Sequence, residues 1–356
     1  MTMIADFFSH GQKQGFYSLA WLEHHRPDIE WITYAEWQDK FNYDWLEHRI
    51  DQALSLGQKV VLLPDEEHIL NPVVPDLARV INQYSGDPVY FGTAFWPPGQ
   101  LFYRHQHSLH SIPMLELQWW HYENCRAYWE ISGAAAPFTP GHNNFMYVVA
   151  RHEHHKFALG QAISESGLRK HGVVTVSADW ADQWPHDWSR FFDVNPNTKS
   201  KVWGNPWKSN SHQVQGLRVS SNITNWQLLQ QSYPDVPLVI NAETSIGIFP
   251  FSEKSFWPIL LGRLFMIFGQ PNHMQNLQRY YSIDMRRYIN TDYDSVPGWD
   301  ISAAQERAAM MLADNQHLIR HAPDVYQELA PELSRASTAL VELLEQQLLS
   351  ELAKIP

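Results

Sequence analysis

The chain has little cysteine, few basic residues and no long apolar run, and each shortage excludes a class of protein. Its single cysteine, Cys125, cannot form a disulfide within the chain and fits a reducing compartment. Acidic residues outnumber basic ones, 38 against 26, and the net charge of -12 argues against a nucleic-acid partner held mainly by phosphate contacts. The longest apolar run, residues 259–268, contains Arg263 and is too short to span a bilayer.

The N-terminal residues show no basic flank followed by an apolar core, so we expect no signal peptide. Together with the cysteine content, this predicts a cytoplasmic protein, soluble or peripheral to a membrane. A chain of 356 residues is longer than a single hydrophobic core usually supports, which predicts two domains. The 16 tryptophans are unusual: aromatic faces stack on sugar rings and bases, although plain packing explains most of them.

The order of apolar runs predicts an α/β fold. Residues 28–37, 58–70 and 87–96 each hold a short apolar strand pattern, and residues 76–86 have helical spacing. Strands separated by helical segments are typical of a parallel, doubly wound sheet. Residues 132–144, rich in small residues, proline and glycine, then predict a linker.

After this linker the alternation restarts. Strands are expected at residues 145–150, 172–177, 237–244 and 263–269, with helices at residues 154–168 and 252–262. The end of the chain, from Ser302 to Leu352, reads as helical. We therefore predict two Rossmann-like domains that face a cleft, residues 1–138 and 139–318, and a C-terminal helical tail, residues 319–356.

The triplet Ser252-Glu253-Lys254 stands where such a fold binds a ligand, because it follows a predicted strand and opens a predicted helix. Ser252 is a good N-cap residue, and Glu253 suits the positive end of the helix dipole. A cation in the first turn is unfavourable for the helix alone, so Lys254 indicates a bound anion. A nucleotide diphosphate fits, because a carboxylate at Glu253 can accept from a ribose diol.

The segment around this triplet, "NAETSIGIFPFSEKSFWPILLGRLFMIFGQP", resembles the donor-binding segment of glycosyltransferases with the two-domain GT-B fold. A second segment, "FMYVVARHEHHKFALGQAISESGLRKHGVVTVS", resembles an upstream strand–helix–strand unit of the same family, a bacterial and phage group distantly similar to α1,3-fucosyltransferases. The two matches cover roughly residues 145–180 and 238–300. The resemblance implies transfer of a sugar from a GDP- or UDP-linked donor to a hydroxyl acceptor on a glycan or another polymer.

The resemblance also implies roles for single residues. Glu253 would hold the ribose of the donor, and Lys254 would hold its phosphates. The acid ahead of this pair is Glu243. The basic positions of the upstream match are Arg151, His155 and Lys156, and the cap residue is Ser252. The implied donor-nucleotide-binding residues are therefore Glu243, Ser252, Glu253, Lys254, Arg151, His155 and Lys156.

No metal ion or other cofactor is expected, because Lys254 and Arg151 can stabilise the departing diphosphate by their charge. The histidine-rich residues 152–155 lack HExxH spacing and a closing Cys/His set, which favours an anion-binding loop or a solvated helix start. Residues 291–295, "TDYDS", are similar to the metal-chelating DxD motif of other transferases. They follow a predicted strand at residues 286–289, and solvated acids in a surface loop are the simpler explanation.

An inverting transfer also needs a base near the acceptor hydroxyl. Asp65, Glu66 and Glu67 come directly after a predicted strand of the N-terminal half and are the candidates, although a polar loop that ends a strand explains each single acid more simply. Two other classes stay open. A non-catalytic carbohydrate-binding protein would explain the tryptophans but not Lys254. A hydrolase or phosphatase would need a set of metal ligands or a GxSxG nucleophile elbow, and the sequence contains no GxSxG.

The tail carries an apolar stripe at helical spacing that must be covered. Packing on the chain's own domains is the first expectation, and a homodimer is the second. The acidic polar face disfavours anionic lipid, which attracts basic helices. The stripe comprises Leu340, Leu343, Leu344, Leu348, Leu352 and Ile355.

Overall fold

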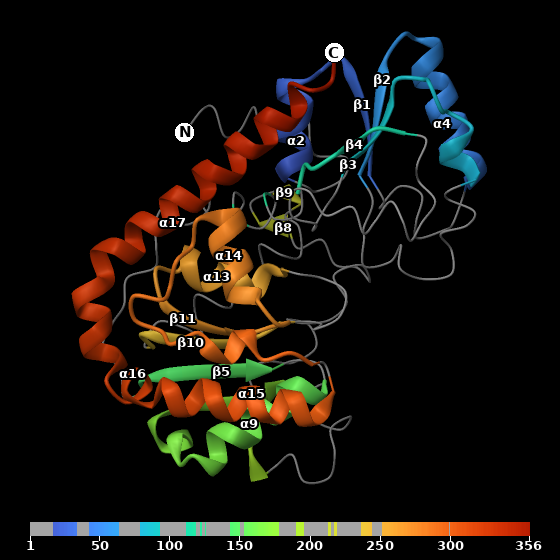
Figure 1. Ribbon diagram of the computed structural model, residues 1–356. Coiled ribbons are helices and arrows are strands. Elements are labelled where there is room, and N and C mark those ends of the chain that lie inside the picture. Colours follow the sequence, from blue (N-terminus) through green and yellow to red (C-terminus); the bar gives the residue numbers. More distant parts are fainter. Residues whose placement is uncertain are drawn as a thin grey trace. The chain divides into compact units, whose positions relative to one another are not determined.

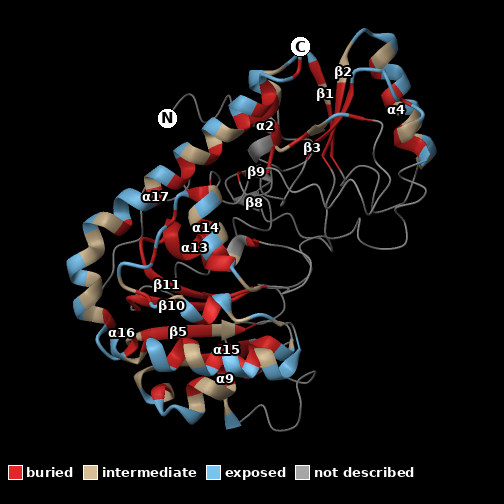
Figure 2. Cartoon of the chain, in the orientation of Figure 1, coloured by how far each residue is buried: buried red, intermediate tan, exposed pale blue. Residues whose placement is uncertain are grey.

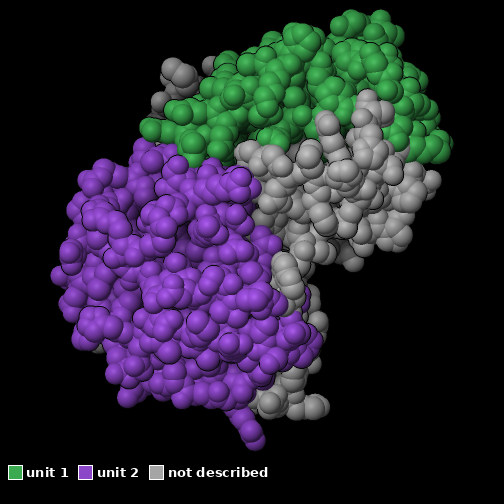
Figure 3. All heavy atoms as spheres, in the orientation of Figure 1, with its two compact units in different colours: residues 1–127, 213–220, 342–356 green, residues 128–212, 221–341 purple. Residues whose placement is uncertain are grey.

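The computed structural model describes most of the C-terminal half of the chain and part of the N-terminal half. The chain divides into two compact units (Figure 3): unit 1 comprises residues 1–127, 213–220 and 342–356, and unit 2 comprises residues 128–212 and 221–341. The described residues are 17–33, 43–63, 79–92, 112–118, 122, 125, 143–149, 153–177, 190–195, 213–214, 217–218, 236–243, 251–298 and 300–356.

Unit 1 contains a four-stranded sheet in which every pair is parallel and the strands lie in chain order (Figure 1). Helix α2 (Tyr17–His25) precedes the first strand, and α4 (Tyr43–Ser55) lies between the first two strands in the sequence. The short strands predicted within residues 28–37, 58–70 and 87–96 are confirmed. They are β1 (Ile29–Thr33), β2 (Lys59–Leu63), β3 (Val89–Gly92) and β4 (Met114–Leu115).

The C-terminal segment is part of unit 1. Helix α17 (Ala322–Leu352) ends against α2, where the Arg26 guanidinium donates to the carbonyl oxygens of Leu352 at 2.9 Å and Ile355 at 3.2 Å. The Glu351 carboxylate accepts from the Glu116 amide at 2.9 Å, beside β4. Five residues of the predicted stripe are buried and Leu343 is half-buried, so packing within the chain is confirmed; the buried five are Leu340, Leu344, Leu348, Leu352 and Ile355.

Unit 2 contains a five-stranded, fully parallel sheet with the order β11-β10-β5-β6-β7. The chain builds β5, β6 and β7 outward in one direction and then returns to add β10 and β11 on the other side of β5. Strand order therefore reverses between β5 and β10. The strands are β5 (Phe145–Val149), β6 (Gly172–Ser177), β7 (Asp193–Asn195), β10 (Leu238–Ala242) and β11 (Leu264–Phe268).

The central strands form because their residues are apolar on both faces. Every residue of β10 and β11 is buried (Figure 2), as parallel sheets covered on both sides require. Helices follow three adjacent strands: α9 (His154–Glu165) follows β5, α13 (Glu253–Leu260) follows β10, and α14 (His273–Tyr281) follows β11. These elements confirm the strands and helices predicted within residues 145–177 and 237–269.

The remaining described elements complete unit 2 and add one small hairpin. Short 3₁₀ turns, η3 (Leu168–His171) and η5 (Asp292–Ser295), connect longer elements. Helices α15 (Ile301–Asp314) and α16 (Gln316–Arg320) lead into α17, and α15 packs on α9. The hairpin pairs β8 (Gln213–Val214) with β9 (Leu217–Arg218). The chain is thus an α/β protein with two parallel sheets and a long C-terminal helix.

Two local expectations are wrong. Residues 286–289, predicted as a strand, form a turn and bend in which the Tyr288 and Ile289 amides donate to the Met285 carbonyl. Asp294, predicted as a solvated acid, is buried. Within the described ranges, no helix combines the length and apolar character needed to cross a membrane.

Candidate functional site

The carboxyl ends of β5, β10 and β11 lie side by side, so the starts of α9, α13 and α14 gather at one edge of the sheet of unit 2. Doubly wound sheets bind ligands outside this edge, where strand order reverses. The reversal here lies between β5 and β10. The expected position of Ser252-Glu253-Lys254, beyond the carboxyl end of a strand at a helix start, is confirmed by the bounds of β10 and α13.

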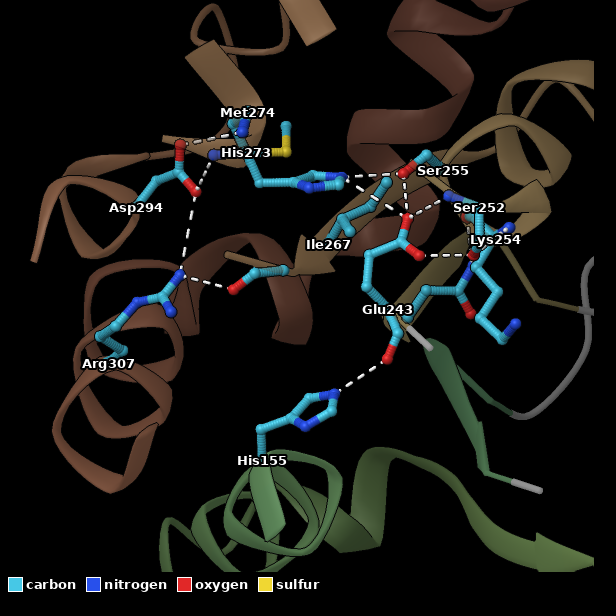
Figure 4. Close-up of polar contacts among 12 residues, drawn as sticks. His155, Glu243, Ser252, Lys254, Ser255, Ile267, His273, Met274, Asp294 and Arg307 are labelled. Carbon is cyan, nitrogen blue, oxygen red and sulfur yellow. Dashed lines mark hydrogen bonds and ion pairs between the residues drawn. The ribbon is translucent and has the colours of Figure 1, made fainter. Parts of the chain in front are cut away.

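A buried carboxylate organises the start of α13 (Figure 4). Glu243 directly follows β10 and is 1% exposed. One of its oxygens accepts from the Ser252 hydroxyl, and the other accepts from the Ser255 hydroxyl and from the Ser252 amide, the latter at 3.3 Å. Ser252 is the N-cap of α13, and its hydroxyl oxygen accepts from the Lys254 amide at 3.3 Å. One carboxylate therefore holds both donors of the cap residue.

His273, the first residue of α14, joins the same network. Its Nε2 atom lies 2.8 Å from the Ser255 hydroxyl oxygen and 3.6 Å from the nearer Glu243 oxygen. Because the Ser255 hydroxyl donates its hydrogen bond to Glu243, its oxygen can only accept from His273. Nε2 therefore carries the hydrogen of the neutral ring, and Nδ1 carries none. Burial lowers the pKa of His273 to about 4, so the ring is neutral at pH 7.

This constellation differs from a hydrolytic triad. In a triad the acid orients the imidazole through one nitrogen while the other nitrogen takes the proton of the nucleophile. Here both the acid and the serine face Nε2, and Nδ1 makes no hydrogen bond with any described residue. Ser255 is also fully buried. The arrangement therefore positions groups and does not activate Ser255 as a nucleophile.

Lys254 lies in the first turn of α13 and is half-buried. Its carbonyl would ordinarily accept from the amide of the residue four positions later, but that residue is Pro258, which has no amide hydrogen. The side chain of Asn241 on β10 donates to this carbonyl at 2.9 Å instead. The peptide groups on both sides of the Lys254 side chain are thus bound by side chains.

The start of α14 is occupied by a carboxylate of the chain itself. Asp294 of η5 accepts from the amides of His273 at 3.0 Å, Met274 at 2.8 Å and Gln275 at 3.3 Å. Burial raises the pKa of Asp294 to about 6, although these donors and the nearby Arg307 act in the opposite direction. An anionic ligand at this helix end would have to displace Asp294.

Arg307 of α15 binds the backbone on both sides of the Asp294 cap. It is 1% exposed and donates to the carbonyl oxygens of Gly269 at 2.8 Å and Tyr293 at 3.2 Å. One of its nitrogens lies 4.0 Å from Asp294. Burial lowers the pKa of Arg307 from its usual value, and the Asp294 charge opposes that effect. Arg307 thereby fixes the turn between β11 and α14.

The start of α9 brings further basic residues to the same edge. His155 and Lys156 lie in its first turn and are both buried. The Nε2 atom of His155 lies 2.8 Å from the backbone oxygen of Glu243, which bridges the two strands at the reversal point. Burial lowers the pKa of His155 to about 4. Glu153, the N-cap residue of α9, makes no side-chain capping bond.

Of the residues expected to bind the donor, the structure brings five to the sheet edge: Glu243, Ser252, Lys254, His155 and Lys156. Glu253 opens α13. The remaining expected site residues lie outside the described residues and comprise Arg151 and the base candidates Asp65, Glu66 and Glu67.

Sequence reasoning missed Asn241, Ser255, His273, Asp294 and Arg307. A usable signal existed for two of them: Asn241 and His273 stand at the carboxyl end of β10 and just after that of β11, where site residues gather. Asp294 lies in the segment 291–295 that was interpreted as solvated, and nothing in the sequence marks Ser255 or Arg307. Within the described ranges, no three His, Cys, Asp or Glu side chains converge as metal ligands. Metal independence stays a prediction.

Comparisons of the chain with protein-family models, with curated proteins and with solved structures found no match.

Proposed function

We propose that the chain is a glycosyltransferase of the GT-B type whose unit 2 binds the diphosphate of a nucleotide-sugar donor at the edge between β5 and β10. The observation that carries this proposal is the position of Lys254. It is a half-buried cation in the first turn of a helix, at the point where strand order reverses. Helix starts attract anions and disfavour cations, so a bound anion explains this lysine.

The chemistry of this edge suits a diphosphate. Lys254 supplies positive charge from α13, and the first turn of α9, with His154, His155 and Lys156, borders the same reversal point. Both helix starts present the positive ends of their dipoles. Glu243 accepts from the two serines and has a positioning role in this proposal, whereas Glu253 is the proposed partner of the ribose.

In the proposed reaction, an acceptor hydroxyl oxygen attacks the anomeric carbon of the sugar, and the bond from that carbon to the diphosphate breaks. The nucleoside diphosphate leaves with the bonding electron pair, and Lys254 stabilises its charge without a cofactor. The acceptor proton passes to a base, for which Asp65, Glu66 and Glu67 are the candidates. A carbohydrate or another hydroxyl compound is the proposed acceptor.

Titration calorimetry with UDP, GDP and CMP tests the proposal. We expect at least one of these nucleotides to bind, whereas a protein that only binds carbohydrate would bind none. Lys254→Ala should weaken binding by the equivalent of roughly 1.5–3 kcal/mol while leaving the melting temperature nearly unchanged. Lys170→Ala is a matched control, because Lys170 is an exposed lysine of the same unit in η3. Equal affinities in both variants would contradict the assignment.

The ribose role of Glu253 has its own test. Glu253→Ala should lower the affinity for a ribonucleotide but hardly change the affinity for the corresponding dideoxynucleotide, which lacks the diol. Equal losses for both nucleotides would remove the ribose role from Glu253 and leave the diphosphate role of Lys254 intact.

A further inference from the structure

The backbone of Lys254 is bound on both sides by side chains, one from the cap residue of α13 and one from the neighbouring strand β10. On the carbonyl side, Pro258 removes the helical donor, and Asn241 donates in its place at 2.9 Å. On the amide side, the Ser252 hydroxyl oxygen accepts from Lys254 at 3.3 Å. An ordinary first turn has neither a missing donor nor a replacement from a neighbouring strand.

The amide side depends on a second layer of buried groups. The Ser252 hydroxyl donates to Glu243, so its oxygen faces the Lys254 amide only while that carboxylate stays in place. Ser255 donates to the other oxygen of Glu243 and accepts from His273. Glu243, Ser255 and His273 are all nearly or fully buried, so water does not replace a lost partner there.

We propose that Asn241 and Ser255 are positioning residues for Lys254: Asn241 holds its carbonyl group, and Ser255, supported by His273, holds the carboxylate that fixes its amide group through Ser252. The importance of this positioning for ligand affinity rests on the proposed function. Fixing the backbone of Lys254 should strengthen ligand binding, because a displacement of a fraction of an ångström weakens the contact between its ammonium group and a phosphate.

The test compares Asn241→Leu, Ser255→Ala and a matched control, Ser337→Ala. Ser337 is a fully buried serine of α17 whose hydroxyl donates to the Leu260 carbonyl at 3.1 Å, at the opposite end of α13. Each variant removes hydrogen bonds of one side chain near the same helix: Asn241→Leu and Ser337→Ala remove one bond each, and Ser255→Ala removes those with Glu243 and His273. We expect Asn241→Leu and Ser255→Ala to weaken binding of the nucleotide found by calorimetry about tenfold. Ser337→Ala should lower stability comparably and leave the affinity unchanged.

A second substitution separates positioning from simple loss of stability. Pro258→Ala restores an amide hydrogen that can donate to the Lys254 carbonyl, so it replaces the bond that Asn241 makes. In the Pro258→Ala background, Asn241→Leu should therefore cost less affinity than in the native chain. An equal cost in both backgrounds would overturn the role of Asn241.

The outcomes distinguish this inference from the proposed function. If the native chain binds nucleotide and both Asn241→Leu and Ser255→Ala bind equally tightly, positioning is wrong and the donor site stands. If the native chain binds no nucleotide, the donor site is wrong, and hydrogen exchange of the Lys254 amide decides the positioning. Faster exchange in Ser255→Ala than in Ser337→Ala would support it, and equal exchange would overturn it. Asn241→Leu affects the carbonyl group of Lys254 and Ser255→Ala affects its amide group, so either variant tests the proposal when the other fails to fold.

Discussion

The imidazole of His155 and the backbone carbonyl of Glu243 are 2.8 Å apart, measured from Nε2 to the oxygen. A carbonyl oxygen can only accept, so Nε2 carries the hydrogen. His155 belongs to the helix that follows β5, and Glu243 follows β10, so this single bond connects the two strand ends at the reversal of strand order. The two borders of the proposed donor site are thereby held together within unit 2.

Removing this donor should destabilise unit 2. His155→Phe keeps an aromatic ring opposite Phe268, whose centroid lies 6.4 Å away, but deletes the hydrogen bond. We expect a loss of about 1–3 kcal/mol in the free energy of unfolding, the usual cost of taking one partner from a buried polar pair. Urea denaturation measures it. His154→Phe, at the adjacent exposed position, should change stability much less, and equal losses in the two variants would contradict the prediction.

The buried histidines also predict how stability depends on pH. Burial lowers the pKa of His155 and of His273 to about 4 in the folded chain, against 6.5 for an exposed histidine. Between these values the unfolded chain binds more protons, so stability falls as pH drops from about 6.5 towards 4. Each histidine contributes a slope of up to about 1.4 kcal/mol per pH unit. Asp294, whose pKa burial raises to about 6, acts in the opposite direction.

Urea midpoints recorded across this pH range provide the check. His155→Phe should flatten the pH dependence of stability by up to one proton, because it removes a group that binds its proton at a higher pH in the unfolded chain than in the folded chain. His154→Phe is again the control. A profile for His155→Phe that runs parallel to that of the native chain would show that His155 does not titrate differently on folding.

Gly269 should not tolerate a side chain, because a side chain there would overlap the imidazole ring of His273. A Cβ atom at Gly269 would lie 2.5 Å from both Cγ and Nδ1 of the imidazole ring. We expect Gly269→Ala to cost about 1–3 kcal/mol of stability through this overlap. In a His273→Ala background the same change should cost less, because the ring is gone. Additive losses in a double-mutant cycle would place the conflict elsewhere.

The C-terminal end of α17 should stabilise unit 1 through one face only. Leu348 is fully buried, whereas its neighbour Leu349 is 42% exposed. Leu348→Ala should lower the free energy of unfolding by about 2–5 kcal/mol, as for other buried leucines. Leu349→Ala is the matched control and should stay within about 0.5 kcal/mol of the native chain. Similar values for the two variants would mean that this end of the helix is not packed as described.

Metal independence is the remaining prediction about activity. If Lys254 and Arg151 carry the charge of the leaving diphosphate, sugar transfer or donor hydrolysis should survive saturating EDTA. The rate before and after chelation measures this directly. Complete loss of activity that manganese restores would contradict the prediction and require a metal site.

The sequence by itself determined the local elements. Runs of apolar residues predicted β1, β2, β5, β10 and β11, because a strand buried on both faces needs little more than such a run. Ser252 was identifiable as a helix cap, since a cap bonds to amides two or three positions away. The stripe of α17 was identifiable because helical periodicity depends only on neighbouring turns.

Only the tertiary structure decided the partners of the polar residues. Glu243, Ser255 and His273 come from a strand end and two helices, and no spacing in the sequence shows that they meet. Asp294 was expected in solvent, yet it is buried and caps a helix that begins 21 residues earlier, at His273. The physical reason is range: a polar residue is buried only when groups distant in the chain supply its hydrogen bonds, and local patterns hold no information about those groups.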